Sequence, residues 1–441
     1  MSKIQIPEGL DTKVCVLGEN VLSEVPEVAK QLWPGLQPVI VADENTWAAA
    51  GQKVMEQLVR AGLNPAEPFI YPAHPVMHAD YKYVAGLVEV VKGKLPIAVG
   101  SGTVNDLVKR SHFEAGCKGY MCVATACSVD GYTSFGAAIT VNGFKKTLEC
   151  PAPLAILADS AVLASAPQDM TASGYADLCA KVVAGADWHI ADILGPTPMD
   201  AKAWGMVQTH LREWVGSPEA LAKGDLKALA GLFNGLAATG FAMQYYRESR
   251  PASGAEHLFS HVWEMDNLAV NGENPSHGFK VAIGTLISTR LMEFAFKHTK
   301  TEIEAICAAA KEVGVEERAA QIDKHLLGTP IYESVKKVCI GKLLTGDALK
   351  VRRRDMVTNW DEMKRRVRGQ IFPYEEMERR FLVLGCPTKP AEIGLDEAEL
   401  RRGIFVAAMI RNRYTILDLL FELGLLEAAI EDVVAMWKAD L

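Results

Sequence analysis

The 441-residue sequence predicts a parallel-sheet α/β domain followed by an all-helical domain. Up to about residue 165, short apolar runs alternate with amphipathic stretches, which is the pattern of βαβ units in a largely parallel sheet. After PLAILAD (residues 153–159) the strand-like runs cease, and long segments of helical periodicity follow. We therefore expect an α/β domain over residues 1–165 and a helical domain over residues 166–441, which ends in an extended helical tail.

Strands and helices are expected to alternate along the first domain. Helices are predicted at residues 21–33, 51–62 and 81–93. Pro167 and Gly174 are expected to interrupt the helices near the domain boundary, where they would form a hinge. Because cofactor and substrate commonly meet between domains, we expect the active site in the cleft there. The expected strands are KVCVLG (13–18), PVIVAD (38–43), PFIYPA (68–73), LPIAVG (95–100), YMCVATA (120–126) and PLAILAD.

Composition excludes several classes of function. The net charge is −8, from 46 basic and 54 acidic residues, which disfavours nucleic acid or an anionic membrane as a partner. The start, MSKIQIPEGL, lacks the apolar core of a secretory signal, and Asp159 interrupts the longest apolar stretch before it could span a bilayer. The nine cysteines form no C-x-x-C pair, so reduced thiols are expected. Together these features predict a cytosolic protein without membrane insertion.

A glycine turn follows the strand LPIAVG. In GSGT (residues 100–103), two glycines allow close backbone approach to an anion, and a helix starting near Val104 or Asn105 would offer unpaired N–H groups to a pyrophosphate. Asn105 replaces the last glycine of the G-x-G-x-x-G fingerprint, so a phosphate site and a plain strand–helix turn both remain open. Asp43, at the end of PVIVAD, could accept from adenosine ribose hydroxyls, although such a residue is also typical of a solvated turn.

The loop ATACSVDGYTSFG (residues 124–136) follows the next strand. Its small and hydroxylated residues and its carboxylate, Asp130, could follow a nicotinamide and its ribose closely. An ordinary Ser/Asp/Gly turn is the alternative. Cys127 lies in this loop without a histidine near it in the sequence, so nothing indicates an activated thiolate.

Three histidines and an aspartate predict a metal site. His257 and His261 are four residues apart and share one face of a helix, His277 can begin another helix capped by Ser276, and Asp177 lies in the helical segment GYADLCAK. Two imidazoles and a carboxylate leave open coordination positions, as catalytic metals require. A polar helix face and a solvated aspartate remain the alternatives. The clustering of three of the ten histidines within 21 residues favours the metal.

Metal and nicotinamide together would serve hydride transfer to a ketone. A divalent cation on the carbonyl oxygen stabilises the developing alkoxide, while the nicotinamide supplies the hydride. His261 is better suited to hydrogen-bond substrate hydroxyls or to relay a proton than to complete the metal shell, and a supporting structural role is its alternative.

Five segments in order carry a resemblance to a known family. The segments GSGTVNDLVK, TACSVDGYTS, GYADLCAK, RPASGAEHLFSH and SHGFKVAIG closely resemble sn-glycerol-1-phosphate dehydrogenases, particularly the bacterial AraM-type members. These belong to the iron-containing alcohol dehydrogenase and dehydroquinate synthase superfamily. The resemblance spans about residues 10–300 and implies a Rossmann-like first domain, a helical second domain and reversible reduction of dihydroxyacetone phosphate with NAD(H) or NADP(H). It also implies one zinc or nickel ion.

The resemblance assigns roles residue by residue. It implies metal binding by Asp177, His257 and His277, because the first histidine of the H-x-x-x-H pattern is the ligand in this superfamily. It implies catalytic roles for Asp177 and His261, and substrate contacts for both of these and for Asp130. The residues implied to bind NAD are Gly100, Ser101, Gly102, Thr103, Val104, Thr125, Ala126, Cys127, Ser128 and Ser134. Asp43 is a further candidate, because of its place at the end of the strand PVIVAD.

Some features depart from the family or leave alternatives. Arg247 and Glu248 stand where small or polar residues are more usual, and Asp177 with Lys181 four residues later differs from the Glu and Lys three apart that are usual in carbocycle-forming dehydroquinate synthases. The alternative functions are such a carbocycle-forming lyase and a dehydrogenase of glycerol or another polyol. We expect a homo-oligomer and, in the basic segment after residue 345, a solvated helical face. The unranked candidates for a substrate phosphate are Lys145, Lys146, Lys181, Arg250 and Lys280.

Overall fold

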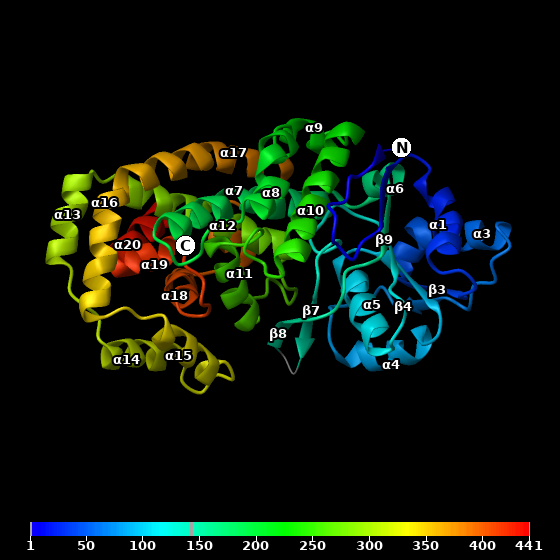
Figure 1. Cartoon of the computed structure of the whole chain (residues 1–441), viewed down its shortest axis with the longest axis horizontal. Helices are drawn as coiled ribbons and strands as arrows, with labels where there is room; N and C mark the ends of the chain where they lie inside the picture. The colour runs from blue at the N-terminus through cyan, green and yellow to red at the C-terminus, as the bar shows by residue number, and fades with distance from the viewer. Residues whose placement is uncertain (1, 142–143, 441) are drawn as a thin grey trace. The chain divides into compact units, whose positions relative to one another are not determined.

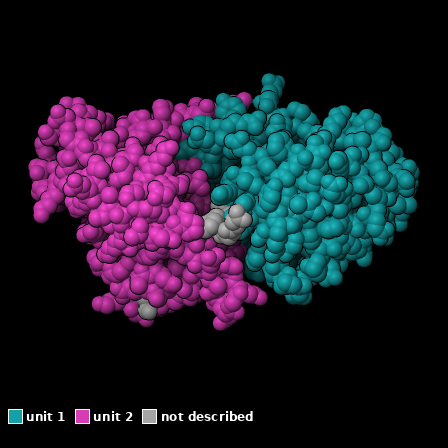
Figure 2. Space-filling view, turned by 90° about the horizontal axis from the view of Figure 1, so that it is seen from below, with its two compact units in different colours: residues 1–178, 205–252 teal, residues 179–204, 253–441 magenta. Residues whose placement is uncertain are grey.

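The computed structural model describes residues 2–141 and 144–440, without the side chains of residues 2, 3, 144 and 145. The chain divides into two compact units, coloured teal and magenta in Figure 2. Unit 1 comprises residues 1–178 and 205–252, and unit 2 comprises residues 179–204 and 253–441. The domain boundary expected after residue 165 stays a prediction. That boundary differs from this division, because residues 205–252, which are mainly helical, belong to unit 1.

Unit 1 is built on a seven-stranded sheet with the order β1-β2-β9-β6-β5-β3-β4. All neighbours are parallel except β1 and β2, which pair antiparallel. The chain leaves β3 for the edge strand β4 and returns to β5 on the other side, so the strand order reverses between β3 and β5. The strands are β1 (Ser2–Lys3), β2 (Val14–Gly18), β3 (Pro38–Asp43), β4 (Phe69–Tyr71), β5 (Leu95–Gly100), β6 (Met121–Ala124) and β9 (Ala155–Asp159).

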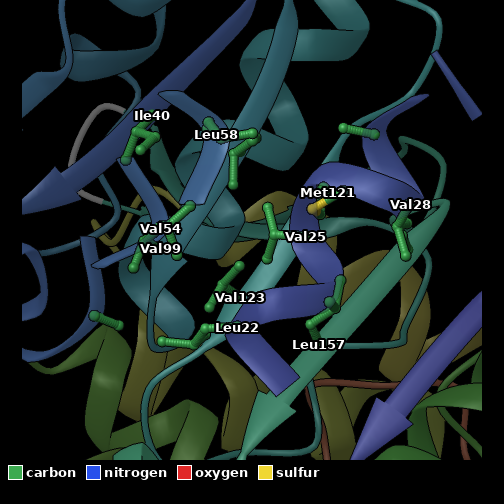
Figure 3. Packing of buried hydrophobic residues seen from close by; sticks show 14 of the residues in the cluster. Leu22, Val25, Val28, Ile40, Val54, Leu58, Val99, Met121, Val123 and Leu157 are labelled. Carbon is green, nitrogen blue, oxygen red and sulfur yellow. The ribbon is translucent and has the colours of Figure 1, made fainter. Parts of the chain in front are cut away.

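Helices cover both faces of this sheet. On one face η1 (Val21–Glu24), α1 (Val25–Leu32) and α3 (Gln52–Arg60) pack their apolar residues against alternate residues of the strands, such as Val99, Val123 and Leu157, as Figure 3 shows. These strand residues are fully buried and their side chains recur with period two. The elements α4 (Lys82–Val91) and α5 (Gly102–Glu114) pack together, and α5 contacts β5 and β3. A parallel sheet requires such cover, because both of its faces are apolar.

The structure confirms the predicted fold class. Every strand expected from the sequence is present, and helices follow in the expected places. Three features were not expected: the short antiparallel strand β1, a hairpin of β7 (Ala137–Val141) and β8 (Phe144–Leu148), and the short elements α2 (Glu44–Thr46) and η2 (Trp47–Gly51) before α3. After β9, only helices and an isolated bridge occur in the described part of the chain up to residue 440.

The expected helix break at Gly174 was wrong. A single helix, α7, runs from Gln168 to Ile193, and Gly174 lies inside it. A Cβ at Gly174 would lie 1.8 Å from the carbonyl oxygen of Cys127. Glycine is therefore required by the close approach of another backbone segment. Pro167 directly precedes the helix, where proline causes no break.

Helix α10 (Leu226–Tyr246) is the one helix in the described residues that is long and apolar enough to cross a membrane by length and composition. Its apolar side chains are accounted for by packing, since 61% of the tested window is buried and the helix contacts α6 (Ser160–Ser165) and α9 (Pro218–Ala222). Close packing extends to Gly240, where a Cβ would lie 1.9 Å from Oγ1 of Thr133. The helix α8 (Ala201–Trp214) precedes α9 in the chain.

Unit 2 is helical in its described residues. Its central pair is α11 (Ala255–Met265) and α12 (His277–Phe296), which pack against one another. The helices that follow in the C-terminal region are α13 (Lys300–Ala309), α14 (Val315–Leu326), α15 (Tyr332–Gly341), α16 (Gly346–Gln370), α17 (Tyr374–Leu384), η3 (Pro390–Ile393), α18 (Glu397–Ala407), α19 (Ile416–Glu422) and α20 (Leu426–Trp437). Helix α18 packs on α11, whereas α17, α19 and α20 contact α12 (Figure 1).

The basic segment after residue 345 forms α16. Its buried side chains recur at helical spacing, from Leu349 to Val367, while several arginines on the helix pair with acidic neighbours, such as Arg365 with Glu362. Arg353 donates instead to the carbonyls of Ala310, Lys311 and Glu422. These contacts agree with the expected amphipathic, partly solvated helix.

A buried carboxylate in α19 predicts a pH-dependent stability. Burial raises the pKa of Glu422 from 4.5 to about 7, although Tyr414 donates a hydrogen bond to it at 2.6 Å and Arg352 lies 3.6 Å away. The folded protein then binds more protons than the unfolded chain between these two values, so this group makes stability fall as pH rises from about 4.5 to about 7. Glu422→Gln should remove that loss and gain up to about 3 kcal/mol relative to the native protein at pH 8.

Thermal denaturation of metal-free protein between pH 5 and pH 8 measures this effect. The difference in melting temperature between Glu422→Gln and the native protein should grow with pH and level off above about pH 7.5. The exposed Glu427→Gln is the matched control and should show no such trend. A constant difference across the range would contradict the assignment.

Candidate active site

The candidate cofactor residues lie at one edge of the sheet. In the register of the parallel strands, Gly100 of β5 is level with Ala124 of β6. Asp43 ends the neighbouring strand β3. The carboxyl ends of these strands therefore meet at the point where the strand order reverses, which is where open α/β sheets bind their ligands.

The glycine turn has the geometry of an anion cradle. Ser101 is the N-cap of α5, which begins at Gly102 and not at the later residues expected from the sequence. The Ser101 hydroxyl accepts from the Gly102 N–H at 2.6 Å. A Cβ at Gly100 would lie 2.6 Å from Cβ of Val104, so only glycine fits there. The first N–H groups of α5 and the helix dipole can therefore receive a phosphate.

The loop after β6 connects this turn with Asp177. The hydroxyl oxygens of Ser101 and Ser128 are 3.2 Å apart. Further along the loop, the backbone N–H of Asp130 donates to Oδ2 of Asp177 at 3.0 Å. Thr125, Ala126, Cys127 and Ser128 are all buried. Burial raises the pKa of the Cys127 thiol well above its usual range, in keeping with the expectation that it is not a reactive thiolate.

Lys109 and Asn105 hold the rest of this loop, and neither was singled out from the sequence for this role. The buried ammonium of Lys109 donates to the carbonyls of Gly131, Ser134 and Gly136 at 2.9–3.1 Å. The Asn105 carboxamide accepts from the Tyr120 hydroxyl at 2.9 Å. The sequence could have indicated this, because the two residues are four apart on α5 and therefore lie on the helix face that the glycine turn begins. Ser134, a predicted cofactor residue, is thus fixed by α5.

Asp43 has a local function as a helix cap. Its Oδ1 accepts from the Thr46 N–H at 2.8 Å, and the Thr46 hydroxyl accepts from the Asp43 N–H at 3.0 Å, which together form a capping box. One carboxylate oxygen of Asp43 therefore serves the turn at the end of β3, as the alternative interpretation of this residue predicted. Its place at the end of β3 still suits a ribose contact, which stays a prediction.

The three histidines lie on two adjoining helix segments of unit 2. His257 and His261 are on α11 with ring centroids 6.5 Å apart. His277 is the first residue of α12, capped by Ser276 as expected, and its ring centroid is 5.3 Å from that of His257. Gly284 of α12 permits this close packing, since a Cβ there would lie 2.4 Å from the carbonyl oxygen of Glu256.

Two glutamates that the sequence did not single out contact the histidines. Glu256, fully buried, lies 2.8 Å from Nδ1 of His257. Glu264 Oε1 lies 3.2 Å from Nδ1 of His277 and from Nζ of Lys280, and its Oε2 lies 3.5 Å from Nδ1 of His261. Desolvation lowers the pKa of His261 despite Glu264, which favours a neutral imidazole at pH 7. A neutral His261 suits a hydrogen bond to a substrate hydroxyl.

Asp177, His257 and His277 form a group that could hold a metal ion. One ligand atom from each lies within 4.8 Å of the others. Metal–ligand bonds of about 2.0–2.2 Å place the ligand atoms of one ion up to about 4 Å apart, which is close to this separation. Asp177 is on α7, which continues into unit 2 after residue 178. One carboxylate and two imidazoles suit a divalent transition-metal ion.

An unsatisfied buried oxygen supports the fit of a cation. Oε2 of Glu256 is inaccessible to solvent and has no hydrogen-bond partner among the described residues. A buried carboxylate in this state costs free energy unless positive charge lies nearby. The residues present therefore fit a divalent metal ion.

The candidates for binding a substrate phosphate differ in environment. Lys181 is fully buried on α7, Arg250 is also buried, and Lys280 is paired with Glu264. Lys146 is exposed on β8, and the side chain of Lys145 lies outside the described residues.

Fold and sequence comparisons agree on the class of protein. A model of the iron-containing alcohol dehydrogenase family matches residues 16–167. The structure of a probable glycerol dehydrogenase from Sinorhizobium meliloti is similar to 96% of this chain and 98% of its own, with a TM-score of 0.58 and 15% identity. The NADH-dependent butanol dehydrogenase A of Thermotoga maritima gives a TM-score of 0.59, with 15% identity over 96% of this chain and 98% of its own. The chain thus has the iron-containing alcohol dehydrogenase fold.

Sequence relatives narrow this class to one family. A glycerol-1-phosphate dehydrogenase [NAD(P)+] of Halalkalibacterium halodurans is 33% identical over 62% of this chain and 69% of its own length. One from Pyrococcus furiosus is 30% identical over 68% of this chain and 85% of its own. The chain belongs to the glycerol-1-phosphate dehydrogenase family, as the sequence motifs indicated. It is accordingly an oxidoreductase, and its family implies NAD(P) and a divalent metal.

Proposed function

We propose that this protein interconverts dihydroxyacetone phosphate and sn-glycerol 1-phosphate, with NAD(H) or NADP(H) as hydride carrier and one zinc or nickel ion. The observation that carries the proposal is the group formed by Asp177, His257 and His277 in a chain of this family. Its relatives' name and the anion cradle at the start of α5 support the same reading. A cytoplasmic location and a homo-oligomeric state are part of the proposal.

The site residues would have three roles: metal binding, substrate contact and dinucleotide binding. Asp177, His257 and His277 hold the metal, which when bound polarises the ketone and stabilises its alkoxide. The Asp130 N–H orients Asp177 through its hydrogen bond, and Asp130 and His261 contact the substrate hydroxyls. The residues proposed to hold the dinucleotide are Gly100, Ser101, Gly102, Thr103, Val104, Thr125, Ala126, Cys127, Ser128 and Ser134, together with Asp43.

Comparison of two ketones tests the phosphate requirement. Protein reconstituted with zinc or nickel should oxidise NADH or NADPH at least about 100-fold more efficiently with dihydroxyacetone phosphate than with dihydroxyacetone. Losing a charge-assisted contact to a dianion costs about 3 kcal/mol or more of transition-state binding. The measurement is kcat/KM for each ketone with the same metal loading. Equal values would contradict the phosphate assignment and favour a polyol dehydrogenase.

A further inference from the structure

The environment of Glu256 goes beyond the ligand set of the proposed metal site. Its Oε1 accepts the Gly254 N–H at 2.7 Å and lies 2.8 Å from Nδ1 of His257. An ionised carboxylate can only accept hydrogen bonds, so the imidazole must donate from Nδ1. That tautomer leaves the lone pair of His257 on Nε2, where a metal ion can bind it.

The carboxylate of Glu256 is held in place by its surroundings. Gly254 leaves room for it, since a Cβ there would lie 2.8 Å from Oε2 of Glu256. The start of the helix is fixed by the buried Asp187, whose Oδ2 accepts the Ala255 N–H at 2.7 Å. The other oxygen of Asp187 accepts the Ile416 N–H at 2.7 Å. The position of Glu256 is therefore determined by the packing of α11, α7 and α19.

No cationic side chain other than a protonated His257 would pair with the Glu256 carboxylate among the described residues. Among the described side chains, Oε1 of Glu256 contacts the imidazole of His257, and Oε2 is buried without a hydrogen bond. Left without a cation, such a carboxylate is destabilising. Its negative charge becomes favourable when a metal-bound imidazole stands beside it, because the carboxylate increases the basicity of the ligand.

We propose that Glu256 is a positioning residue that selects Nε2 of His257 as the metal ligand and strengthens metal binding through its charge. The inference rests on the proposed metal site. Glu264 stands in a similar relation to His277, but its Oε1 also binds Lys280. Because that charge is shared, loss of Glu264 should weaken metal binding less than loss of Glu256.

Metal affinity and metal-free stability distinguish this role from a structural one. Glu256→Gln keeps the size and an accepting oxygen but removes the charge, and it should raise the Kd for Zn²⁺ and Ni²⁺ by about 10- to 100-fold. The melting temperature of the metal-free variant should be no lower than that of the native protein, because the uncompensated charge is gone. Kd values are measured by competition with a chromophoric chelator, and stability is measured by thermal denaturation.

Two further variants complete the experiment. Glu273→Gln, an exposed change near the start of α12, should leave the Kd unchanged. Glu256→Asp keeps the charge, moves it back by one methylene and should give an intermediate Kd. If the native protein binds metal and Glu256→Gln binds it within twofold as tightly, this inference alone is overturned. A metal-free Glu256→Gln that is destabilised in parallel with its metal affinity also overturns it. A native protein that binds neither ion overturns the metal site and this inference together.

Discussion

Replacing His277 with alanine should abolish the metal-dependent activity. The substitution removes one of three protein ligands and leaves a carboxylate and one imidazole, which cannot hold a divalent ion in a defined geometry. Metal affinity should fall by more than the roughly 10- to 100-fold expected for supporting residues. Activity at a fixed, low concentration of free metal should drop by at least about 1,000-fold. His257→Ala should behave in the same way.

Metal content after desalting and NADH oxidation provide the two measurements. His210→Ala is the matched control, because His210 is exposed on α8, where its imidazole pairs only loosely with Glu213. That variant should keep one metal ion per chain and native activity. Stoichiometric metal in both His257→Ala and His277→Ala would remove the basis of the proposed site.

Replacing Gly174 with alanine should disrupt the cofactor loop and destabilise the fold. The new Cβ would lie 1.8 Å from the Cys127 carbonyl oxygen and 3.1 Å from Cα of Ser128. These are backbone atoms, so no side-chain rotation relieves the clash, and α7 must move away from the loop. We expect a loss of about 3 kcal/mol in the free energy of unfolding. A lower NADH affinity should accompany it, because residues 125–128 form the proposed nicotinamide loop.

The same substitution at Gly86 is the control. Gly86 lies in α4, and a Cβ there would meet nothing within 4 Å. Gly86→Ala should therefore stabilise the protein by up to about 1 kcal/mol through helix propensity. Thermal denaturation and a fluorescence titration with NADH measure both variants. Native stability in Gly174→Ala would contradict the close contact between α7 and the loop after β6.

Local pattern was enough to predict the parallel sheet and the start of the helical region. Strands such as PVIVAD and LPIAVG have uninterrupted apolar runs, which both structure and burial bear out. The hairpin of β7 and β8 was missed although Asn142-Gly143 between its strands is a typical hairpin signal. Gly174 was misread as a helix break, since its reason is a contact with residues far away in the sequence.

The site was predictable where chemistry is carried by residue type and spacing. Histidines four apart on one helix and a capped helix start at His277 could be inferred from the chain alone. The roles of Glu256 and Glu264 could not, because many exposed glutamates have the same local sequence context. Only packing distinguishes a glutamate that is fully buried beside His257 from one in solvent. Lys109 could have been noticed from its place four residues after Asn105 on α5, but its contacts with the loop carbonyls follow only from packing.

The configuration of the glycerol phosphate formed distinguishes the proposed reaction from its enantiomeric alternative. Metal-loaded protein is given dihydroxyacetone phosphate and an excess of NADH, and the glycerol phosphate formed is treated with a dehydrogenase specific for sn-glycerol 3-phosphate. We expect this second enzyme to oxidise none of the product, because hydride transfer gives sn-glycerol 1-phosphate. Complete oxidation of the product would contradict the proposed function, even if the metal site were occupied as described.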